Sequence, residues 1–206
     1  MRLIASPASQ IKKMKIGLIS DTHIPESTDK LWPQVFSAFR DVDAILHAGD
    51  LHELFVVEQL AELAPIYVAR GNGDDGSGGR KAVPEDDRLK ENWVMEFGEI
   101  TIAMTHYVPI PEMPPHHTVA RWIDRLFDGC PPDVLIYGDT HVEAIDTVDG
   151  ILCVNPGSPT LPHNLNTQLG TIGFLEIQGK KVDASIWQLT EDGMQPFDWE
   201  NSRRPW

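Results

Sequence analysis

The 206-residue chain carries 17 Lys and Arg against 31 Asp and Glu, which gives a formal net charge of −14. So large an acidic excess argues against a broad basic surface for a nucleic-acid backbone. Hydrophobic residues make up 41% of the chain, which suits one globular domain. The sequence contains no apolar run near the roughly 20 residues that a membrane helix needs.

The first half of the chain alternates short apolar runs with segments of helical spacing. The runs at residues 16–19, 44–46 and 66–68 predict buried strands. Residues 31–39 and 53–63 lie between them and predict helices, so the strands are expected to be parallel with crossover connections. Glycine-rich residues 73–79, and the charged stretch that follows them to residue 92, predict a mobile loop.

The second half of the chain is richer in strands. Residues 93–97 and 100–104 flank Gly98-Glu99 and predict a hairpin, and residues 117–127 predict a helix after a proline-rich loop. Further strands are expected at residues 134–137, 143–148, 151–154, 171–177 and 182–188. We expect a flexible N-terminal extension at residues 1–14, a single domain at residues 15–190, and a C-terminal tail at residues 191–206. The pattern predicts two packed sheets sandwiched between helices.

Five short polar clusters each follow directly after one of the apolar runs. They are Asp21-Thr22-His23, Gly49-Asp50, Gly71-Asn72, Thr105-His106 and Gly138-Asp139-Thr140-His141. Open α/β sheets bind ligands at the carboxyl ends of their strands, so five strand ends can bring these side chains to one crevice. Carboxylate, imidazole and amide oxygen are ligands for borderline or hard divalent cations. Each cluster alone is an ordinary turn, but their joint occurrence predicts a metal centre with two metals.

The order of these motifs resembles that of the calcineurin-like metallophosphoesterases, and most closely their small YfcE-like branch. The shared order is Asp-x-His, Gly-Asp, Gly-Asn-x-Asp, a single His, Gly-x-Thr-His and then Asn155-Pro156-Gly157-Ser158. The resemblance covers the chain from Lys15 to about Leu189. It implies an α/β fold, namely a four-layer α-β-β-α sandwich of two mixed sheets flanked by helices, with a dinuclear site.

The resemblance also assigns seven residues to the two metals. Asp21, His23 and His141 would bind one metal, Asn72, His106 and Asp139 would bind the other, and Asp50 would bridge the two. Three of them, Asp50, Asn72 and His106, would take part in catalysis. The implied reaction is hydrolysis of a small phosphodiester or phosphomonoester by metal-activated hydroxide attack at phosphorus. The implied cofactors are two divalent ions, manganese first, with nickel, zinc, iron or magnesium as alternatives.

Three positions depart from the family pattern. Asp139 stands where the family commonly has His, and Gly73 stands where many catalytic members have a His that is a candidate acid for the leaving group. After His106, the usual Gly-His is replaced by Tyr107-Val108. The last two changes keep a second hypothesis open, a catalytically weak scaffold that binds a partner protein, as the retromer subunit of this fold does. His52 is the remaining histidine that could enter the pocket.

The expected partner is a small phosphoester substrate, with no nucleic-acid polymer and no membrane. The resemblance allows a homo-oligomer. No secretory signal is evident in the first 15 residues, and Cys130 and Cys153 suit free thiols in a reducing compartment. We therefore expect a cytoplasmic protein.

Overall fold

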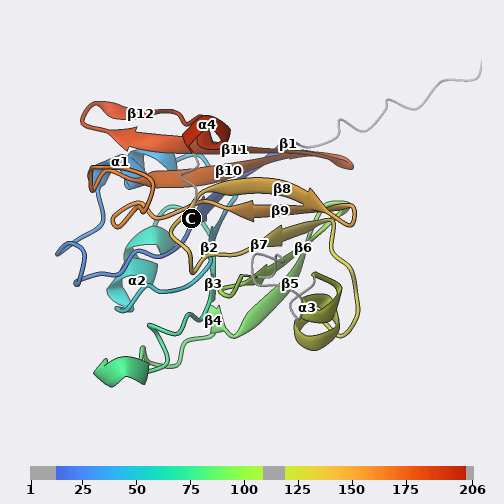
Figure 1. The fold of residues 1–206 in the computed structure, drawn as a ribbon, viewed down its shortest axis with the longest axis horizontal. Helices are drawn as coiled ribbons and strands as arrows, with labels where there is room; N and C mark the ends of the chain where they lie inside the picture. The colour runs from blue at the N-terminus through green and yellow to red at the C-terminus, as the bar shows by residue number, and fades with distance from the viewer. Residues whose placement is uncertain (1–12, 109–118, 203–206) are drawn as a thin grey trace, which may run out of the picture.

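The computed structural model describes residues 13–108 and 119–202, which form two β-sheets packed face to face with helices on both outer sides (Figure 1). The larger sheet has seven strands in the order β12-β11-β10-β1-β2-β3-β4. Strands β1 to β4 run parallel to one another, and β10, β11 and β12 are antiparallel additions. The bounds are Lys13–Ile19 for β1, Ala44–His47 for β2, Ile66–Ala69 for β3, Leu89–Lys90 for β4, Thr171–Gln178 for β10, Lys181–Thr190 for β11 and Gly193–Pro196 for β12.

The smaller sheet has five strands in the order β5-β6-β7-β9-β8. Its centre is parallel, from β6 through β7 to β9, and β5 and β8 pair antiparallel at the two edges. The bounds are Asn92–Phe97 for β5, Ile100–Thr105 for β6, Val134–Ile136 for β7, Ala144–Val148 for β8 and Ile151–Asn155 for β9. The hairpin expected around Gly98-Glu99 is confirmed by the β5–β6 pairing.

Helices cover the outer face of each sheet (Figure 1). They are α1 (Pro33–Ala38), α2 (Phe55–Ala61), α3 (Val119–Leu126) and α4 (Trp199–Ser202), with a short 3₁₀ helix η1 at Ser77–Gly79. Among the residues described, no helix combines the length and apolar character needed to span a membrane. Both cysteines are free, with Cys130 exposed and Cys153 buried.

The structure has four layers, namely helices, the larger sheet, the smaller sheet and a helix, and a hydrophobic cluster fills each of the three interfaces between them. In β2, Ile45 packs into the cluster beneath α1 and α2, whereas its neighbour Leu46 packs into the cluster between the sheets. This alternation follows from the two-residue period of a strand, which sends successive side chains to opposite faces. The third cluster joins Ile123 of α3 to Leu135 of β7. The expected four-layer α-β-β-α sandwich of two mixed sheets is therefore confirmed.

Strands extend into both segments that were expected to be an N-terminal extension and a C-terminal tail. Residues 1–12, most of the expected N-terminal extension, lie outside the described residues, and β1 begins at Lys13, inside that extension. The expected C-terminal tail at residues 191–206 contains β12, which pairs with β11 from Trp187 to Thr190. Because β12 has only four residues and both begins with Gly193 and ends with Pro196, it lacks the apolar alternation that marks a strand in sequence. The start of the helix expected at residues 117–127 also falls partly outside the described residues.

Candidate metal centre

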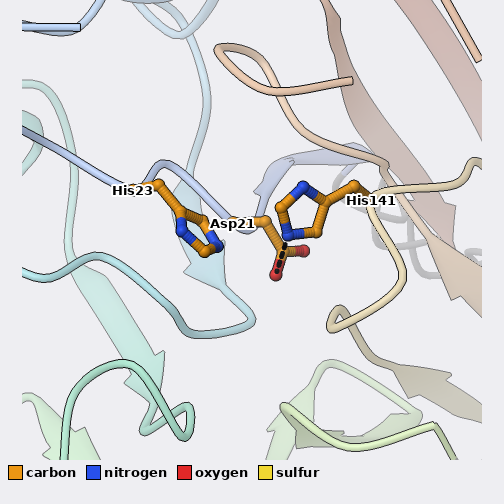
Figure 2. A group of neighbouring side chains, drawn as sticks. All are labelled: Asp21, His23 and His141. Carbon is orange, nitrogen blue, oxygen red and sulfur yellow. Dashed lines mark ion pairs between the residues drawn. The ribbon is translucent and has the colours of Figure 1, made fainter. Parts of the chain in front are cut away.

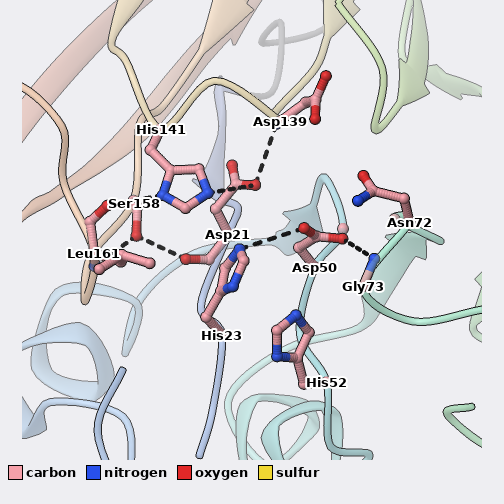
Figure 3. Close-up of polar contacts among 12 residues, drawn as sticks. Asp21, His23, Asp50, His52, Asn72, Gly73, Asp139, His141, Ser158 and Leu161 are labelled. Carbon is pink, nitrogen blue, oxygen red and sulfur yellow. Dashed lines mark hydrogen bonds and ion pairs between the residues drawn. The ribbon is translucent and has the colours of Figure 1, made fainter. Parts of the chain in front are cut away.

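The carboxyl ends of five strands meet at one place and bring the predicted ligands together (Figure 3). Asp21 and His23 follow β1, Asp50 follows β2, Asn72 follows β3, His106 follows β6, and Asp139 and His141 follow β7. Both sheets therefore contribute to the same cluster. The structure places all seven predicted ligands around one site, which is the arrangement expected at the strand ends of an α/β sheet.

The backbone at these strand ends is unusual. Asp21, His23, Asp50, Asp139 and His141 all have positive φ, between 44° and 72°. Residues other than glycine rarely adopt this left-handed conformation, and instances tend to gather at functional sites. The turns after β1 and β2 lie side by side, because the Asp21 N–H donates to the Gly49 carbonyl at 2.8 Å and the His23 N–H donates to the Asp50 carbonyl at 2.9 Å.

Glycine before a ligand lets the neighbouring strand ends approach closely. Gly49 has a φ of 96°, and a Cβ there would lie 2.6 Å from Nδ1 of His106. A Cβ at Gly71 would collide with the Asp50 carboxylate. The Gly-Asp and Gly-Asn dipeptides are therefore required by packing around the site and are more than generic turn residues.

Asp21, His23 and His141 form the first group of donors (Figure 2). Asp21 is fully buried, and its Oδ1 lies 3.6 Å from Nε2 of His141. The Nδ1 of His141 is 2.8 Å from the Leu161 carbonyl, which can only accept a hydrogen bond. The proton of a neutral His141 therefore sits on Nδ1, and the Nε2 lone pair faces Asp21, as in histidines that bind metals.

The electrostatics of this first group suit a cation. Burial raises the pKa of Asp21 to about 6 and lowers the pKa of His141 to about 4. Both shifts arise because a charged form is poorly solvated in the interior. A bound cation would stabilise the Asp21 carboxylate and would use the neutral form of His141.

Asp50 lies between the first group and a second group, and each of its oxygens faces a different histidine. Oδ2 lies 3.3 Å from Nε2 of His23, and Oδ1 lies 3.4 Å from Nε2 of His106. The Gly73 N–H donates to Oδ1 at 2.7 Å. Although burial opposes it, the contacts with His23 and His106 hold the pKa of Asp50 well below its usual range. Asp50 is thus an ionised carboxylate with one oxygen directed to each side.

Lone pairs converge in the second group as well. The Nδ1 of His106 is 2.7 Å from the Ala48 carbonyl, so in the neutral ring Nε2 carries a lone pair. That Nε2 faces oxygen atoms of Asn72 at 3.2 Å, Asp50 at 3.4 Å and Asp139 at 3.7 Å. Burial works against protonation of His106, but the charges of Asp21 and Asp50 outweigh it and raise the pKa of His106. In the absence of a cation, a proton on Nε2 would relieve the repulsion among these atoms.

The donor set therefore fits divalent cations, and a further observation agrees with this. The Nε2 of His23 is buried, and its 3.3 Å approach to Oδ2 of Asp50 lacks the geometry of a hydrogen bond, so it has no hydrogen-bond partner among the described residues. Buried polar atoms are nearly always satisfied, so such an atom beside two carboxylates indicates a missing ligand. Asp139 is the least buried of the three carboxylates, with 40% of its side chain exposed against 6% for Asp50. It stands at the rim of the site.

Asp74 is a supporting residue to which the sequence pattern gave no role. Its fully buried carboxylate accepts the backbone N–H groups of Asp50, Leu51, His52 and Gly71 at 2.8–2.9 Å. It thereby joins the turn after β2 to the turn after β3. The only signal in the sequence is its place as the last residue of Gly-Asn-x-Asp.

The Asn155–Ser158 segment supports the site from the other side. The Ser158 hydroxyl donates to the Asp21 carbonyl at 2.7 Å, and the Asn155 amide donates to the Gly138 carbonyl at 2.9 Å. Both contacts hold backbone and leave the metal-facing side chains free. The segment therefore shapes the site as a turn, in line with its motif.

Two further histidines have different surroundings. His47 is a packed core residue, because its Nδ1 accepts the Gly49 N–H at 3.1 Å and its Nε2 lies 3.2 Å from the Thr22 hydroxyl. His52 enters the site, with its ring centroid 4.3 Å from that of His23 (Figure 3).

Comparison with known proteins gives concordant matches over most of the chain. A family model described as a calcineurin-like phosphoesterase superfamily domain matches residues 14–180. A probable metallophosphoesterase of Methanothermobacter thermautotrophicus is 35% identical over 173 residues, which span 84% of this chain and 91% of that protein. Phosphodiesterase MJ0936 of Methanocaldococcus jannaschii is 27% identical over 173 residues, which span 82% of this chain and 96% of that protein.

Solved structures with the same fold include two of vacuolar protein sorting 29. The protein from Cryptosporidium parvum has a TM-score of 0.68 and 21% identity, covering 89% of this chain and 95% of that chain. The protein from Entamoeba histolytica, solved as a complex with Zn²⁺, has a TM-score of 0.65 and 21% identity, covering 88% and 96%. A predicted phosphoesterase from Streptococcus pneumoniae has a TM-score of 0.59 and 22% identity, covering 90% and 98%.

Proposed function

The chain belongs to the calcineurin-like phosphoesterase superfamily, and from that premise we propose that it is a metal-dependent phosphoesterase acting on a small phosphodiester or phosphomonoester. The family expected from the motif order is thereby confirmed. Its relatives include proteins named as phosphoesterases and a phosphodiesterase, and the present chain carries a full set of candidate ligands.

The observation that carries this proposal is the position of Asp50. Its two oxygens lie 3.3 Å and 3.4 Å from imidazole nitrogens of two different donor groups, as a carboxylate shared between two cations requires. Divalent cations, when bound, supply Lewis-acid activation of water and of the phosphoryl group. The role of the chain is to hold and orient them and to set the charge of the site.

The carboxylates set that charge. Asp21, Asp50 and Asp139 together offset three of the four positive charges of two divalent ions, which leaves about +1 to attract phosphate. His141 and His106 would bind the ions as neutral imidazoles, because the Leu161 and Ala48 carbonyls hold their Nδ1 protons and leave the Nε2 lone pairs for the metals. In a protein with a net charge of −14, such a centre is the feature that would concentrate an anionic substrate.

We further propose manganese as the metal in the second group. Asp50, Asn72 and Asp139 offer oxygen, with His106 as the single nitrogen donor. Oxygen-rich sites suit manganese and magnesium better than they suit softer ions.

The test is turnover of bis(p-nitrophenyl) phosphate and p-nitrophenyl phosphate by the full chain, stripped of metal and then supplied with Mn²⁺. We expect activity that depends on added metal and is abolished in Asp50→Asn, a variant of nearly equal size that lacks the charge. Metal content measured by elemental analysis in the same samples would link activity to occupancy. Turnover of the wild type no faster than that of Asp50→Asn, with Mn²⁺, Zn²⁺ or Ni²⁺ each supplied, would overturn the proposal.

A second candidate function is a weakly catalytic scaffold that binds a partner protein. It is favoured by Gly73, which places no side chain beside Asp50, and by the likeness of the fold to vacuolar protein sorting 29. The same experiment separates the two candidates. Full metal occupancy without turnover of either aryl ester would favour the scaffold.

A further inference from the structure

The chain carries a third Asp-x-His triplet at the site, Asp50-Leu51-His52. Its Asp and His have φ of 55° and 68°, both in the left-handed region. The same pairing occurs in Asp21-Thr22-His23, with 53° and 44°, and in Asp139-Thr140-His141, with 72° and 57°. His52 therefore leaves its strand end with the backbone geometry of two histidines that face the metal site.

The imidazole of His52 is buried and forms no hydrogen bond to a described residue. Its residue is 8% exposed, and neither Nδ1 nor Nε2 forms a hydrogen bond to a described residue. By contrast, both ring nitrogens of the fully buried His47 have partners. The Nε2 of this buried ring calls for a ligand, because buried polar atoms are almost always paired and no described residue lies within hydrogen-bond geometry of it. Figure 3 shows the Nε2 end of His52 directed toward Asp50.

The distances suit a shared cation. The donor atoms of His23, Asp50 and His52 all lie within 4.8 Å of one another. Donors on one zinc ion sit at roughly 2.0–2.2 Å from it, so two of them are at most about 4.4 Å apart. A small rotation of His52 about its side-chain bonds would close the difference.

The surroundings of Nδ1 of His52 favour the tautomer that leaves the lone pair on Nε2. Oε2 of Glu26 lies 3.7 Å from Nδ1, and Arg80 fixes that carboxylate through hydrogen bonds of 2.7 Å and 3.0 Å. A carboxylate on the outer nitrogen favours a proton there and leaves the Nε2 lone pair facing inward, as in the carboxylate–histidine arrangement around protein metals.

Gly73 provides the room for this ring. A Cβ at residue 73 would collide with Nε2 of His52, so any side chain there would push the imidazole away. The position of the His52 ring in the site therefore depends on glycine at residue 73.

We propose that His52 is an additional ligand of the metal held by Asp21, His23 and His141, an inference that rests on the metal centre of the proposed function. With His52 this site has three imidazoles, whereas the opposite site offers mainly oxygen. Nitrogen-rich sites favour zinc, nickel and cobalt relative to manganese. The two sites of this chain therefore differ in metal preference.

The experiment measures Zn²⁺ binding to the metal-free full chain by calorimetric titration. For His52→Ala we expect the tighter site to weaken by about 10- to 100-fold, the loss seen even for outer partners of metal ligands. Gly73→Ala keeps every ligand but displaces the ring, and should weaken the same site. The control is Glu53→Ala, which changes the exposed residue next to His52 and removes no proposed ligand, and it should bind Zn²⁺ as the wild type does.

A second measurement does not depend on any variant folding. Long-range ¹H–¹⁵N spectra of the histidine rings in the wild type should show the Nε2 signal of His52 move to the position of a metal-bound nitrogen when Zn²⁺ is added. Unchanged Zn²⁺ affinity in His52→Ala, or an unshifted His52 signal at saturating Zn²⁺, would overturn the inference. So would unchanged metal affinity with weaker binding of inorganic phosphate, which would make His52 a substrate contact. If the wild type binds no Zn²⁺ at all, the proposed function itself fails.

Discussion

Replacing Asp21 by Asn should make the metal-free protein more stable at neutral pH, although it removes a proposed ligand. Asp21 is fully buried, and burial raises its pKa from 3.8 to about 6. Between these two values the unfolded chain has released the proton while the folded chain still holds it. The folded state binds more protons, so its stability falls as pH rises through this window.

The size of the effect follows from the same shift. At 1.36 kcal/mol for each pKa unit, the rise from 3.8 to about 6 corresponds to about 3 kcal/mol lost between pH 4 and pH 7. Asn has nearly the same shape and cannot ionise. It also keeps an oxygen for the Ser20 hydroxyl, which lies 2.6 Å from the carboxylate.

The assay is urea unfolding of both proteins in the presence of a chelator, at several pH values from 4 to 7. The free energy of unfolding of Asp21→Asn minus that of the wild type should grow by about 3 kcal/mol over this range. With saturating metal the order should reverse, because the wild type alone gains the full binding free energy. A difference that stays constant from pH 4 to pH 7 would refute the reasoning.

Four more predictions concern the site. Asp50→Ala should lose both metals and His23→Ala should weaken one, which elemental analysis can check; two tightly bound metals in Asp50→Ala would contradict the shared ligand. Asp139→His should move the acidic limb of the pH–rate profile to lower pH and reduce the advantage of manganese over zinc or nickel, and no change in either would show that Asp139 does not touch the metal. Gly73 has no side chain to protonate the leaving oxygen, so the rate enhancement of about 10²–10⁴-fold that a general acid supplies is missing. Hydrolysis rates over a series of aryl esters should therefore fall steeply as the leaving-group pKa rises. A flat dependence would indicate that another residue acts as the acid. Asp74→Ala should lower the free energy of unfolding by about 3 kcal/mol or more, because four buried N–H groups lose their acceptor; a loss below about 1 kcal/mol in urea unfolding would contradict this role.

The sequence alone predicts the positions of most elements and of the ligand cluster. Parallel buried strands appear as continuous apolar runs, and a polar side chain directly after such a run must lie at the sheet edge, so Asp21 and Asp50 could be placed together. The two-residue strand β4 and the four-residue strand β12 are too short to show such a pattern, and the sequence does not predict them.

The roles of the supporting residues could not be predicted from the sequence. Asp74 and His52 look like an ordinary turn residue and an ordinary loop histidine in the sequence. Their roles depend on contacts between the turns after β2 and β3, where Asp74 accepts the N–H groups of both turns and Gly73 leaves room for His52. Only the packed structure brings these turns together.

The left-handed backbone at the ligand positions lowers the stability of the fold while it orients the side chains that would bind metal. Conformations of this kind cost of order 1–3 kcal/mol each in residues that carry a Cβ, and Asp21, His23, Asp50, Asp139 and His141 all adopt one. Glycine at any of these positions would relax the backbone and erase a metal donor in the same step. A screen for thermal tolerance alone would therefore select against the site, whereas a screen that requires bound metal would retain it.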